Sequence, residues 1–559
     1  MPLAEHLAAT CSIGNRKSEI VNPLMTARTR TDLLLLAGFC TFLFSYGIAQ
    51  FGLIGADEPR YAQVAREMLD RKDLVTPTLG GKSWLEKPPL YYWQAMIVYS
   101  LVGVSDTAAR IPSAIDATIL VIAVYLFFRK FRPTVEVDAA LITASCAGVV
   151  GFARAASMDM PLTAAFAIGM LAWWAWRESE KRIYLAAFYL FMALGTLAKG
   201  PVAPFLAAVV LVTYSAAVRE ARLIVKTAWL PGILLFLAVA LPWYIAVQMR
   251  NPQFFRAFIL EHNLARFSTN LYHHPEPFWY YIPVLLLALV PWIVFVIAAF
   301  AHSIRVWWAE RAAQSDSELG FRVFLCCWLI LPLVFFSISR SKLPGYILPA
   351  VPAGALLLAD YLRQQLEQQN PLPKWLAILH ALISCAPIVP AVLIGYIVTT
   401  HRLTGGRSLW VALAVALVLM LGIALTLSGR MQWRMLRFVT LIPVVLAVAA
   451  VVKLGTGAID QRLSTRSLAY ELASVETHKL PLAVCGTSRE VEFGLAFYRD
   501  QIIDRYESGA VPAGEHLLVA APSWKSNVTE WTKGRRVTSL GHYAPQDLDY
   551  YWVAATANR

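Results

Sequence analysis

The stretch LLLLAGFCTFLFSYGIAQF (residues 33–51) is followed closely by ADEPRYAQVAREML (residues 56–69). The first is an apolar run long enough, as an α-helix, to cross roughly 30 Å of hydrocarbon. The second places two acids, Asp57 and Glu58, and the basic Arg60 where such a helix leaves the bilayer. Charges beside a membrane-embedded segment need partners, so this boundary indicates a membrane span that ends at a polar site.

The rest of the chain repeats the apolar pattern. Of its 559 residues, 58% are hydrophobic and 15% are charged, and the mean hydropathy is +0.55. A soluble chain of this length carries far more charge. The sequence therefore predicts an all-α polytopic membrane bundle. The predicted spans are 33–51, 111–128, 137–153, 158–176, 183–198, 201–218, 228–248, 278–302, 322–337, 344–361, 375–399, 408–428 and 437–456.

One further apolar run, 89–104, would make fourteen crossings. Leaving it out, with the N-terminus in the cytoplasm, puts at least two basic residues in each short cytoplasmic loop, as the positive-inside rule requires. Including it moves all of these loops outside. We therefore predict thirteen crossings in a transmembrane domain at 33–456, a cytoplasmic tail at 1–32, and a segment 89–104 that is re-entrant or lies along the outer surface. Orientation also explains the net charge of +13 without a nucleic-acid partner.

The tail, residues 457–559, has a different pattern. LPLAVCGTSREVEFGLAFYRD (480–500) mixes short β-like runs with helical stretches and turns, which predicts a small soluble α/β domain on the outer face. The sequence leaves two functions open for this domain, a scaffold or a lid that contacts substrate.

The basic residues on the outer face are the informative ones, because the positive-inside rule disfavours them. Several lie close to span ends, where a fixed positive charge can meet an anion at the membrane surface. They include Arg60, Arg66, Lys82, Lys87, Lys199, Arg250, Arg256, Arg266, Arg340 and Lys342.

The first outer loop, 52–110, contains the largest concentration of these charges. Within it, DEPRYAQVAREML (57–69) predicts a short amphipathic helix, with Pro59 in the first turn and Asp57 or Glu58 as a cap. Its apolar positions recur at helical spacing, which favours a stripe lying on the membrane surface.

Later in the same loop, Glu86 and Lys87 lie between aromatic residues. Two other outer segments carry polar groups: Asp159 begins a span, and Lys342 and Tyr346 lie at a span mouth. Lysine and tyrosine can both donate to phosphate oxygens. Simpler interpretations are helix capping for the acids and snorkelling anchors for the lysines.

A histidine cluster lies in the same outer region. His262, His273 and His274, with Glu86 as the carboxylate, resemble a ligand set for a divalent metal, Zn or Mg. Their spacing matches no specific metal motif.

The motifs DEPRYAQVAREML (57–69), TLGGKSWLEKPPLYYW (78–93) and SKLPGYILP (341–349) resemble those of polyprenyl-phosphate-sugar-dependent transferases with the C-type glycosyltransferase fold. Within that group the chain is most similar to the aminoarabinose lipid A transferases, which are related to protein O-mannosyltransferases. The resemblance covers about residues 30–360 by motif and the remainder by architecture. It implies an outer active site and a soluble C-terminal domain.

The resemblance also implies roles for individual residues. The residues expected to be catalytic are Asp57, Asp159 and Lys87. Those expected to bind the donor phosphate are Arg60, Lys87, Lys342, Tyr346 and Arg266. Those expected to bind substrate are Glu58, Tyr61 and Glu86.

The implied reaction moves 4-amino-4-deoxy-L-arabinose, with inversion, from undecaprenyl phosphate to a lipid A phosphate on the periplasmic side of the bacterial inner membrane. This lipopolysaccharide modification gives resistance to polymyxin. A monomer that needs no cofactor is expected. Asp57 is expected to bind the sugar amine or stabilise oxocarbenium-like charge, or to act as a base if the acceptor is a hydroxyl. The alternatives are a transferase acting on a protein or another glycan, and a lipid flippase.

Overall fold

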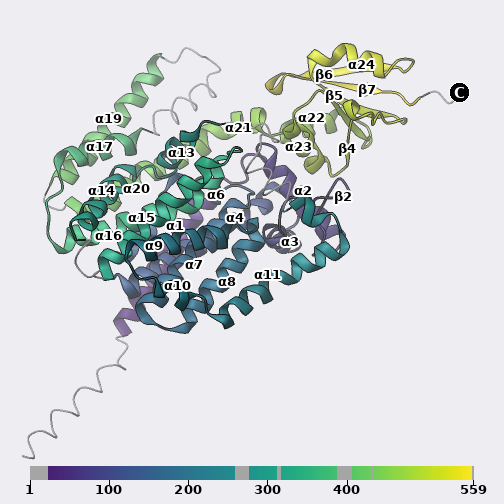
Figure 1. Cartoon of the computed structure of the whole chain (residues 1–559). Helices are drawn as coiled ribbons and strands as arrows, with labels where there is room; N and C mark the ends of the chain where they lie inside the picture. Colours follow the sequence, from purple (N-terminus) through teal and green to yellow (C-terminus); the bar gives the residue numbers. More distant parts are fainter. Residues whose placement is uncertain (1–22, 259–275, 311–316, 387–405, 430–431, 557–559) are drawn as a thin grey trace, which may run out of the picture.

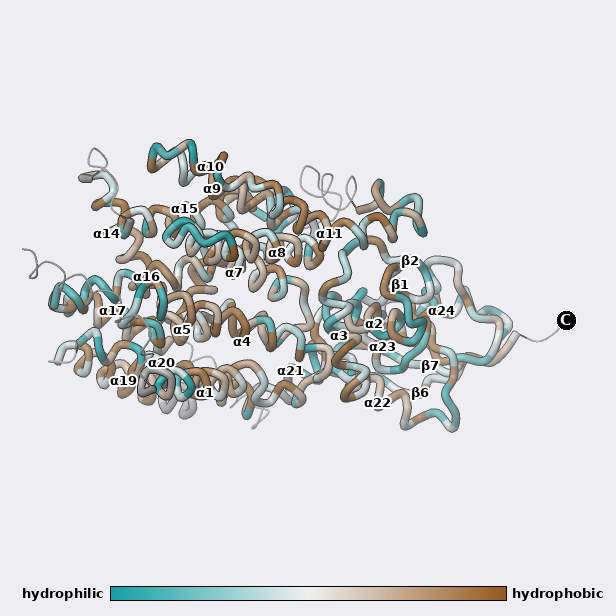
Figure 2. The backbone as a smooth tube through the Cα atoms, turned by 90° about the horizontal axis from the view of Figure 1, so that it is seen from below, coloured by the Kyte–Doolittle hydropathy of each residue, from teal (hydrophilic) through white to brown (hydrophobic). Residues whose placement is uncertain are grey.

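The structure is a computed structural model that describes residues 23–258, 276–310, 317–386, 406–429 and 432–556. It has a bundle of helices with a small mixed domain at one end (Figure 1). Hydrophobic positions predominate along the bundle helices, whereas hydrophilic positions are frequent in the small domain and the segments next to it (Figure 2).

Each predicted span contains helix among the described residues. The bundle helices are α1 (Pro23–Ser45), α4 (Asp106–Phe131), α5 (Glu136–Ser145), α6 (Ala147–Ala153), α7 (Asp159–Ser179), α8 (Arg182–Lys199), α9 (Val202–Ala217), α11 (Leu230–Arg250), α13 (Tyr281–Ala288), α14 (Ile293–Glu310), α15 (Ser317–Ile338), α16 (Val351–Glu367), α17 (Lys374–Cys385), α19 (Gly406–Ser428) and α20 (Gln432–Ala450). In the described part of the chain, six helices are long and apolar enough to cross a membrane, or up to eight if two bent pairs each form one span. The chain is thus a multi-pass membrane protein, and the count of thirteen crossings stays a prediction.

The apolar run at 89–104 forms the short helix α3 (Leu90–Val102). At about 1.5 Å per residue it covers roughly 20 Å, less than the thickness of the hydrocarbon core. It packs against α4 and against α2 (Asp57–Asp70), and Tyr91, Tyr92 and Ala95 are fully buried. Its aromatic side chains therefore belong to the core beneath the first outer loop.

The amphipathic helix is present as α2, but its apolar stripe was wrongly expected on the membrane surface. Val64, Ala65 and Met68 are fully buried in a core shared with α3, the start of α4 and Phe497 of the C-terminal domain. The expected side-chain cap is also absent, because the N-cap position of α2 is Ala56, whose side chain has no hydrogen-bond acceptor. Protein rather than lipid covers the stripe.

The C-terminal domain has a five-stranded sheet in the order β4-β3-β5-β7-β6. The strands β3, β4 and β5 are parallel to one another, and β7 runs antiparallel to β5 and β6. The predicted small α/β domain is confirmed. Its elements are α21 (Thr456–Leu463), α22 (Arg466–Val475), β3 (Leu482–Cys485), α23 (Arg489–Arg499), β4 (Ile503–Arg505), β5 (His516–Ala520), α24 (Lys525–Trp531), β6 (Val537–Tyr543) and β7 (Leu548–Val553).

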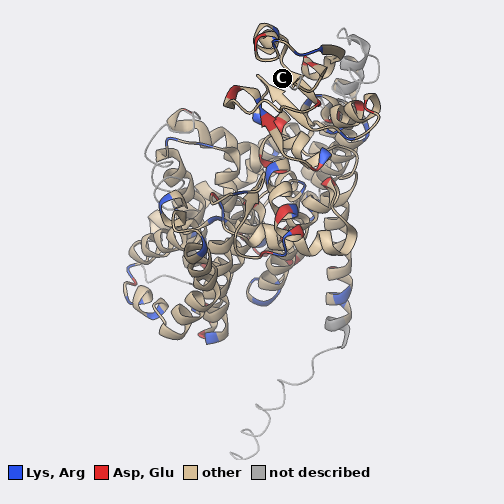
Figure 3. Cartoon of the chain, turned by 90° about the vertical axis from the view of Figure 1, so that its right-hand side faces the viewer, with Lys and Arg blue, Asp and Glu red and all other residues tan. Residues whose placement is uncertain are grey.

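Polar contacts fasten this domain to the chain around α2. The Leu53 amide donates to the Tyr498 hydroxyl at 2.6 Å, and Arg66 of α2 donates to the Phe497 carbonyl at 2.8 Å. Arg466 forms an ion pair with Asp106 at 3.0 Å. Charged residues gather around this junction, whereas much of the bundle has none (Figure 3). The domain is therefore docked directly over the helix that begins with Asp57.

Candidate active site

An acidic and a basic side chain contact one another in the first turn of α2. Asp57 forms an ion pair with Arg60, and about half of the Asp57 side chain remains exposed. The Arg60 guanidinium lies 5.1 Å from the ring centroid of Tyr61, 5.2 Å from that of Trp84 and 5.8 Å from that of Phe493. Such distances permit cation–π attraction. Aromatic rings from three segments thus hold the guanidinium beside Asp57.

Polar atoms around Arg60 have unused hydrogen-bonding capacity. In the described part of the chain, Arg60 Nε, Trp84 Nε1 and the Tyr92 hydroxyl are buried without a hydrogen-bond partner. Burial lowers the pKa of Arg60, but Tyr61 and the carboxylates of Asp57 and Glu86 raise it more, so that the net shift is upward. Arg60 therefore stays cationic. Buried donors without partners are costly, and an anionic group bound here would satisfy them.

A second acid–base pair lies at the start of α7. Asp159 forms an ion pair with Lys199, the last residue of α8, and accepts a hydrogen bond from the Ser157 hydroxyl at 3.0 Å. The Lys199 ammonium lies 4.5 Å from the ring centroid of Tyr346. A Cβ atom at Gly345 would come within 2.6–2.8 Å of the Asp159 carboxylate group, so only glycine fits there. The segment PGY (344–346) therefore closes directly over Asp159.

Tyr61 connects the two pairs. Burial raises the pKa of its hydroxyl well above the ordinary value, and the charges of Asp57 and Asp159 both raise it further. Tyr61 therefore remains a neutral donor at physiological pH. The Ala156 amide, three residues before Asp159, donates to Glu58 next to Asp57 at 2.8 Å, so the segments that carry Asp57–Arg60 and Asp159–Lys199 lie side by side and form one polar region, hereafter the centre.

Glu58 has a different environment from Asp57. Its carboxylate accepts from Arg110 at 2.6 Å, from the Ile54 amide at 2.7 Å and from the Ala156 amide at 2.8 Å. These contacts bind α2 to α4 and to the loop that leads to Asp159. They give Glu58 a structural function, and its contact with substrate stays a prediction.

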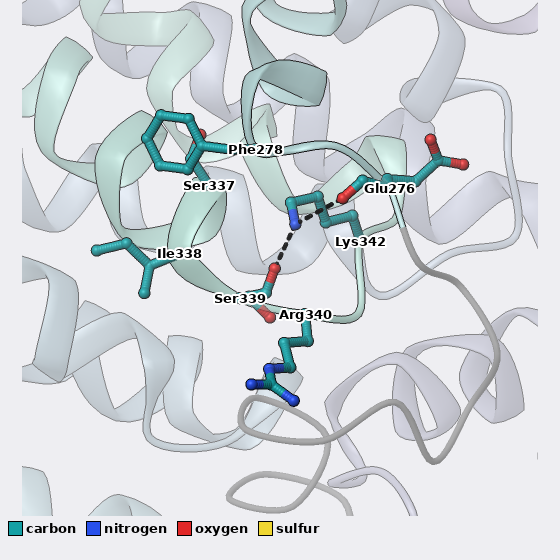
Figure 4. A pocket seen from close by; sticks show the side chains of 7 residues that line it. All are labelled: Glu276, Phe278, Ser337, Ile338, Ser339, Arg340 and Lys342. Carbon is teal, nitrogen blue, oxygen red and sulfur yellow. Dashed lines mark hydrogen bonds between the residues drawn. The ribbon is translucent and has the colours of Figure 1, made fainter.

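Lys342 borders a separate cavity of about 530 Å³. Its ammonium donates to the Ser339 carbonyl at 2.5 Å and to the Glu276 carbonyl at 3.1 Å, whereas the Arg340 guanidinium points away from it (Figure 4). Burial lowers the pKa of Lys342, and the nearby charge of Glu276 partly offsets this effect. One of the three ammonium protons remains for an anionic ligand.

Comparison with known proteins shows the family. The profile of the family described as dolichyl-phosphate-mannose-protein mannosyltransferase matches residues 86–245. A protein of Aeromonas hydrophila subsp. hydrophila is 30% identical over 481 residues, which are 82% of each chain, and is named undecaprenyl phosphate-alpha-4-amino-4-deoxy-L-arabinose arabinosyl transferase. The chain belongs to the aminoarabinose transferase family.

Other members of this family agree with that placement. A protein of the same name from Pseudomonas aeruginosa (strain UCBPP-PA14) is 32% identical over 350 residues, and the match spans 62% of this chain and 62% of that relative. The crystal structure of ArnT from Cupriavidus metallidurans bound to undecaprenyl phosphate superimposes with a TM-score of 0.71 at 22% identity, covering 94% of this chain and 99% of that one. The expected C-type glycosyltransferase fold is thus confirmed.

Some residues that the family resemblance indicated are brought together, and others are not. The centre unites Asp57, Arg60, Tyr61, Asp159 and Tyr346. Glu86 acts electrostatically on Arg60, and the half-buried Lys87 follows it in the turn before α3. Their roles stay predictions.

The metal prediction cannot be placed in the structure. His262, His273 and His274, as well as Arg266, lie outside the described residues. Within the described ranges, no group of three or more His, Cys, Asp and Glu side chains could hold a metal ion. Glu86 is therefore the one predicted ligand whose position is known.

Three contributors to the site have only a weak signal in the sequence. Lys199 appeared only among the outer-face bases, although its place at the end of a span before Gly200 was informative. Trp84 has no feature in the sequence that distinguishes it from the other aromatic residues of its segment. Phe493, in the C-terminal domain, carries no local feature that points to Arg60.

Proposed function

We propose that this protein is a glycosyltransferase that moves 4-amino-4-deoxy-L-arabinose from undecaprenyl phosphate to a phosphate of lipid A. The observation that carries the proposal is the pair of acid–base contacts Asp57–Arg60 and Asp159–Lys199, on segments joined by the hydrogen bond from the Ala156 amide to Glu58. The names of the relatives support the choice of donor and sugar.

The cations act on the leaving group. An oxygen of the acceptor phosphate forms the new bond to the anomeric carbon while the bond from that carbon to the undecaprenyl phosphate oxygen breaks, and the electron pair leaves on the phosphate. Arg60 and Lys199 stabilise this departing negative charge. In this proposal these side chains supply the positive charge at the leaving group. One-step displacement inverts the anomeric centre.

The acids act on the sugar. A phosphate monoester has a second pKa of about 6, so the acceptor is already a nucleophile at neutral pH and needs no general base. Asp57, half exposed beside Arg60, is free to bind the sugar amine and to stabilise oxocarbenium-like charge. Lys199 and Ser157 hold Asp159 in place as the second acid whose charge acts on Tyr61.

The proposed location is the bacterial inner membrane, with the site and the C-terminal domain facing the periplasm and the protein acting as a monomer. The positive-inside distribution of the short loops supports this orientation. Reporter fusions at the C-terminal domain and at the loop after α4 test it. A cytoplasmic C-terminal domain would contradict the proposal.

The decisive experiment expresses the full chain in cells that lack their own aminoarabinose transferase and analyses their lipid A by mass spectrometry. Lipid A that carries the added aminoarabinose is the expected product. Unmodified lipid A together with a newly glycosylated protein or glycan would show that this other molecule, and not lipid A, is the acceptor. Movement of the carrier lipid without any sugar transfer would indicate a flippase instead.

A further inference from the structure

A large cleft lies between the first outer loop and the C-terminal domain. Its volume is about 900 Å³. One wall is formed by α2 and by the hairpin of β1 (Thr78–Leu79) and β2 (Lys82–Ser83), and the other by α23, β4 and the segments beside them. The proposed reaction assigns no role to this cleft, although the cleft and the centre both lie where the C-terminal domain contacts the α2 region.

The cleft and the centre share walls. Trp84 and Phe493, whose rings lie against the Arg60 guanidinium, also line the cleft. Glu86 lines it too, and its charge acts on Arg60. A molecule in the cleft would therefore lie next to the Asp57–Arg60 pair, separated from it by side chains that contact both.

The lining offers unsatisfied polar groups. Thr487 is only 7% exposed, and within the described ranges its hydroxyl has no hydrogen-bond partner. The buried Trp84 Nε1 is in the same condition. Both residues line the cleft. Buried polar atoms of this kind are normally paired, so they indicate a polar ligand.

The charges of the lining are mixed. Two carboxylates are already occupied: Glu67 accepts from Thr78 at 2.7 Å and from the Gly80 amide at 2.7 Å, and Glu492 pairs with Arg505 at 2.5 Å. Asp504 provides a further acceptor for a hydroxyl group, Glu86 adds negative charge, and the bases Lys82 and Arg489 provide positive charge on opposite walls. This combination of aromatic faces, acceptors and cations suits a sugar that carries both hydroxyl and phosphate groups.

We propose that the cleft binds the phosphorylated sugar headgroup of the acceptor lipid. This inference rests on the proposed function and assigns a task to the C-terminal domain. Thr487 hydrogen-bonds to the sugar, Trp84 and Phe493 cover its apolar face, and Arg489 with Lys82 holds its negative charge.

The test uses the purified full chain and measures its affinities for lipid A and for undecaprenyl phosphate separately. Thr487→Val removes the hydroxyl with little change of shape, and Arg489→Ala removes one cation. Each is expected to weaken lipid A binding about fivefold to tenfold, the effect of a lost hydrogen bond or charged contact, with an unchanged affinity for undecaprenyl phosphate. Thr487→Ser should restore binding.

Matched controls lie in the same domain, away from the cleft. Thr529→Val and Arg536→Ala, both at exposed positions, should leave both affinities unchanged. Wild-type affinity for lipid A in the Thr487 and Arg489 variants would overturn the inference, and so would an equal loss of undecaprenyl phosphate binding. Because binding is measured directly, lipid A that binds through the cleft but receives no sugar contradicts the proposed function and leaves the cleft assignment standing.

Discussion

Arg110 lies fully buried beneath Glu58, with 2.6 Å between Nη2 and Oε2. The same guanidinium donates to the carbonyls of Phe51 and Gly52, both at 2.8 Å. One arginine in α4 thus fixes the backbone that leads into α2, while Glu58 extends the network to Ala156 near Asp159. The distance between Asp57 and Asp159 therefore depends on a residue that contacts neither of them.

Glu58→Gln is expected to destabilise the protein. It leaves Arg110 buried without a counter-charge, and breaking a buried ion pair in this way costs about 3–5 kcal/mol. The measurement is the thermal unfolding midpoint in detergent. Glu67→Gln, in the same helix, is the control. Glu67 accepts from neutral donors, so this change should lower the unfolding midpoint less than Glu58→Gln does. Equal midpoints for both variants would show that Arg110 does not need Glu58.

Asp57→Asn is expected to lower kcat by roughly 100- to 1,000-fold, the effect of losing one charge that stabilises a transition state. Binding of the donor should persist, because Arg60 and its rings remain. Steady-state transfer and donor affinity are measured together. Asp70→Asn, at the exposed end of α2, should behave as wild type. Unchanged transfer in Asp57→Asn would remove this acid from the mechanism.

Lys199→Ala is expected to lower kcat and to raise the KM for the donor, because the leaving phosphate loses a cation and Asp159 loses its partner. Combined with Asp159→Asn, the two changes should be non-additive by about 0.5–3 kcal/mol. Lys181→Ala, at the opposite end of α8, is the matched control. Strict additivity would mean that the pair does not act as a unit.

The environment of Lys342 predicts that donor affinity depends on pH. Burial lowers its pKa from the ordinary 10.5, so its ammonium loses a proton at a lower pH than a free lysine does. If the ammonium holds the donor phosphate, donor affinity should decline as the pH rises toward 10.5, with a midpoint below that value. Lys342→Arg, which stays charged, should move the decline to higher pH. A pH profile of donor KM that is identical in both proteins would exclude this role.

Hydropathy and charge predicted a multi-pass helical bundle with a small C-terminal α/β domain, and the family resemblance indicated part of the centre. Apolar runs predict spans because backbone groups in lipid must be satisfied within a helix, and Asp57 and Asp159 lie where spans begin or end. The neighbours Asp57 and Glu58 show the limit. Successive helical residues point in different directions, and only the packed structure shows which acid is exposed and which is paired with Arg110.

The apolar stripe of α2 shows the same limit in another form. Its spacing predicts a buried face but does not say what covers that face, and here Phe497 and α3 cover it instead of lipid. Phe493 could not be connected with Arg60 because the contact joins segments far apart in the sequence. Tertiary contacts of this kind leave no trace in local periodicity.

The bond from the Leu53 amide to the Tyr498 hydroxyl has a consequence for biosynthesis. The ribosome makes the α2 segment early and the α23 segment near the end, yet each completes the surroundings of the other. The contacts of Phe493, Phe497 and Tyr498 with the α2 region therefore form only after this late segment has been made.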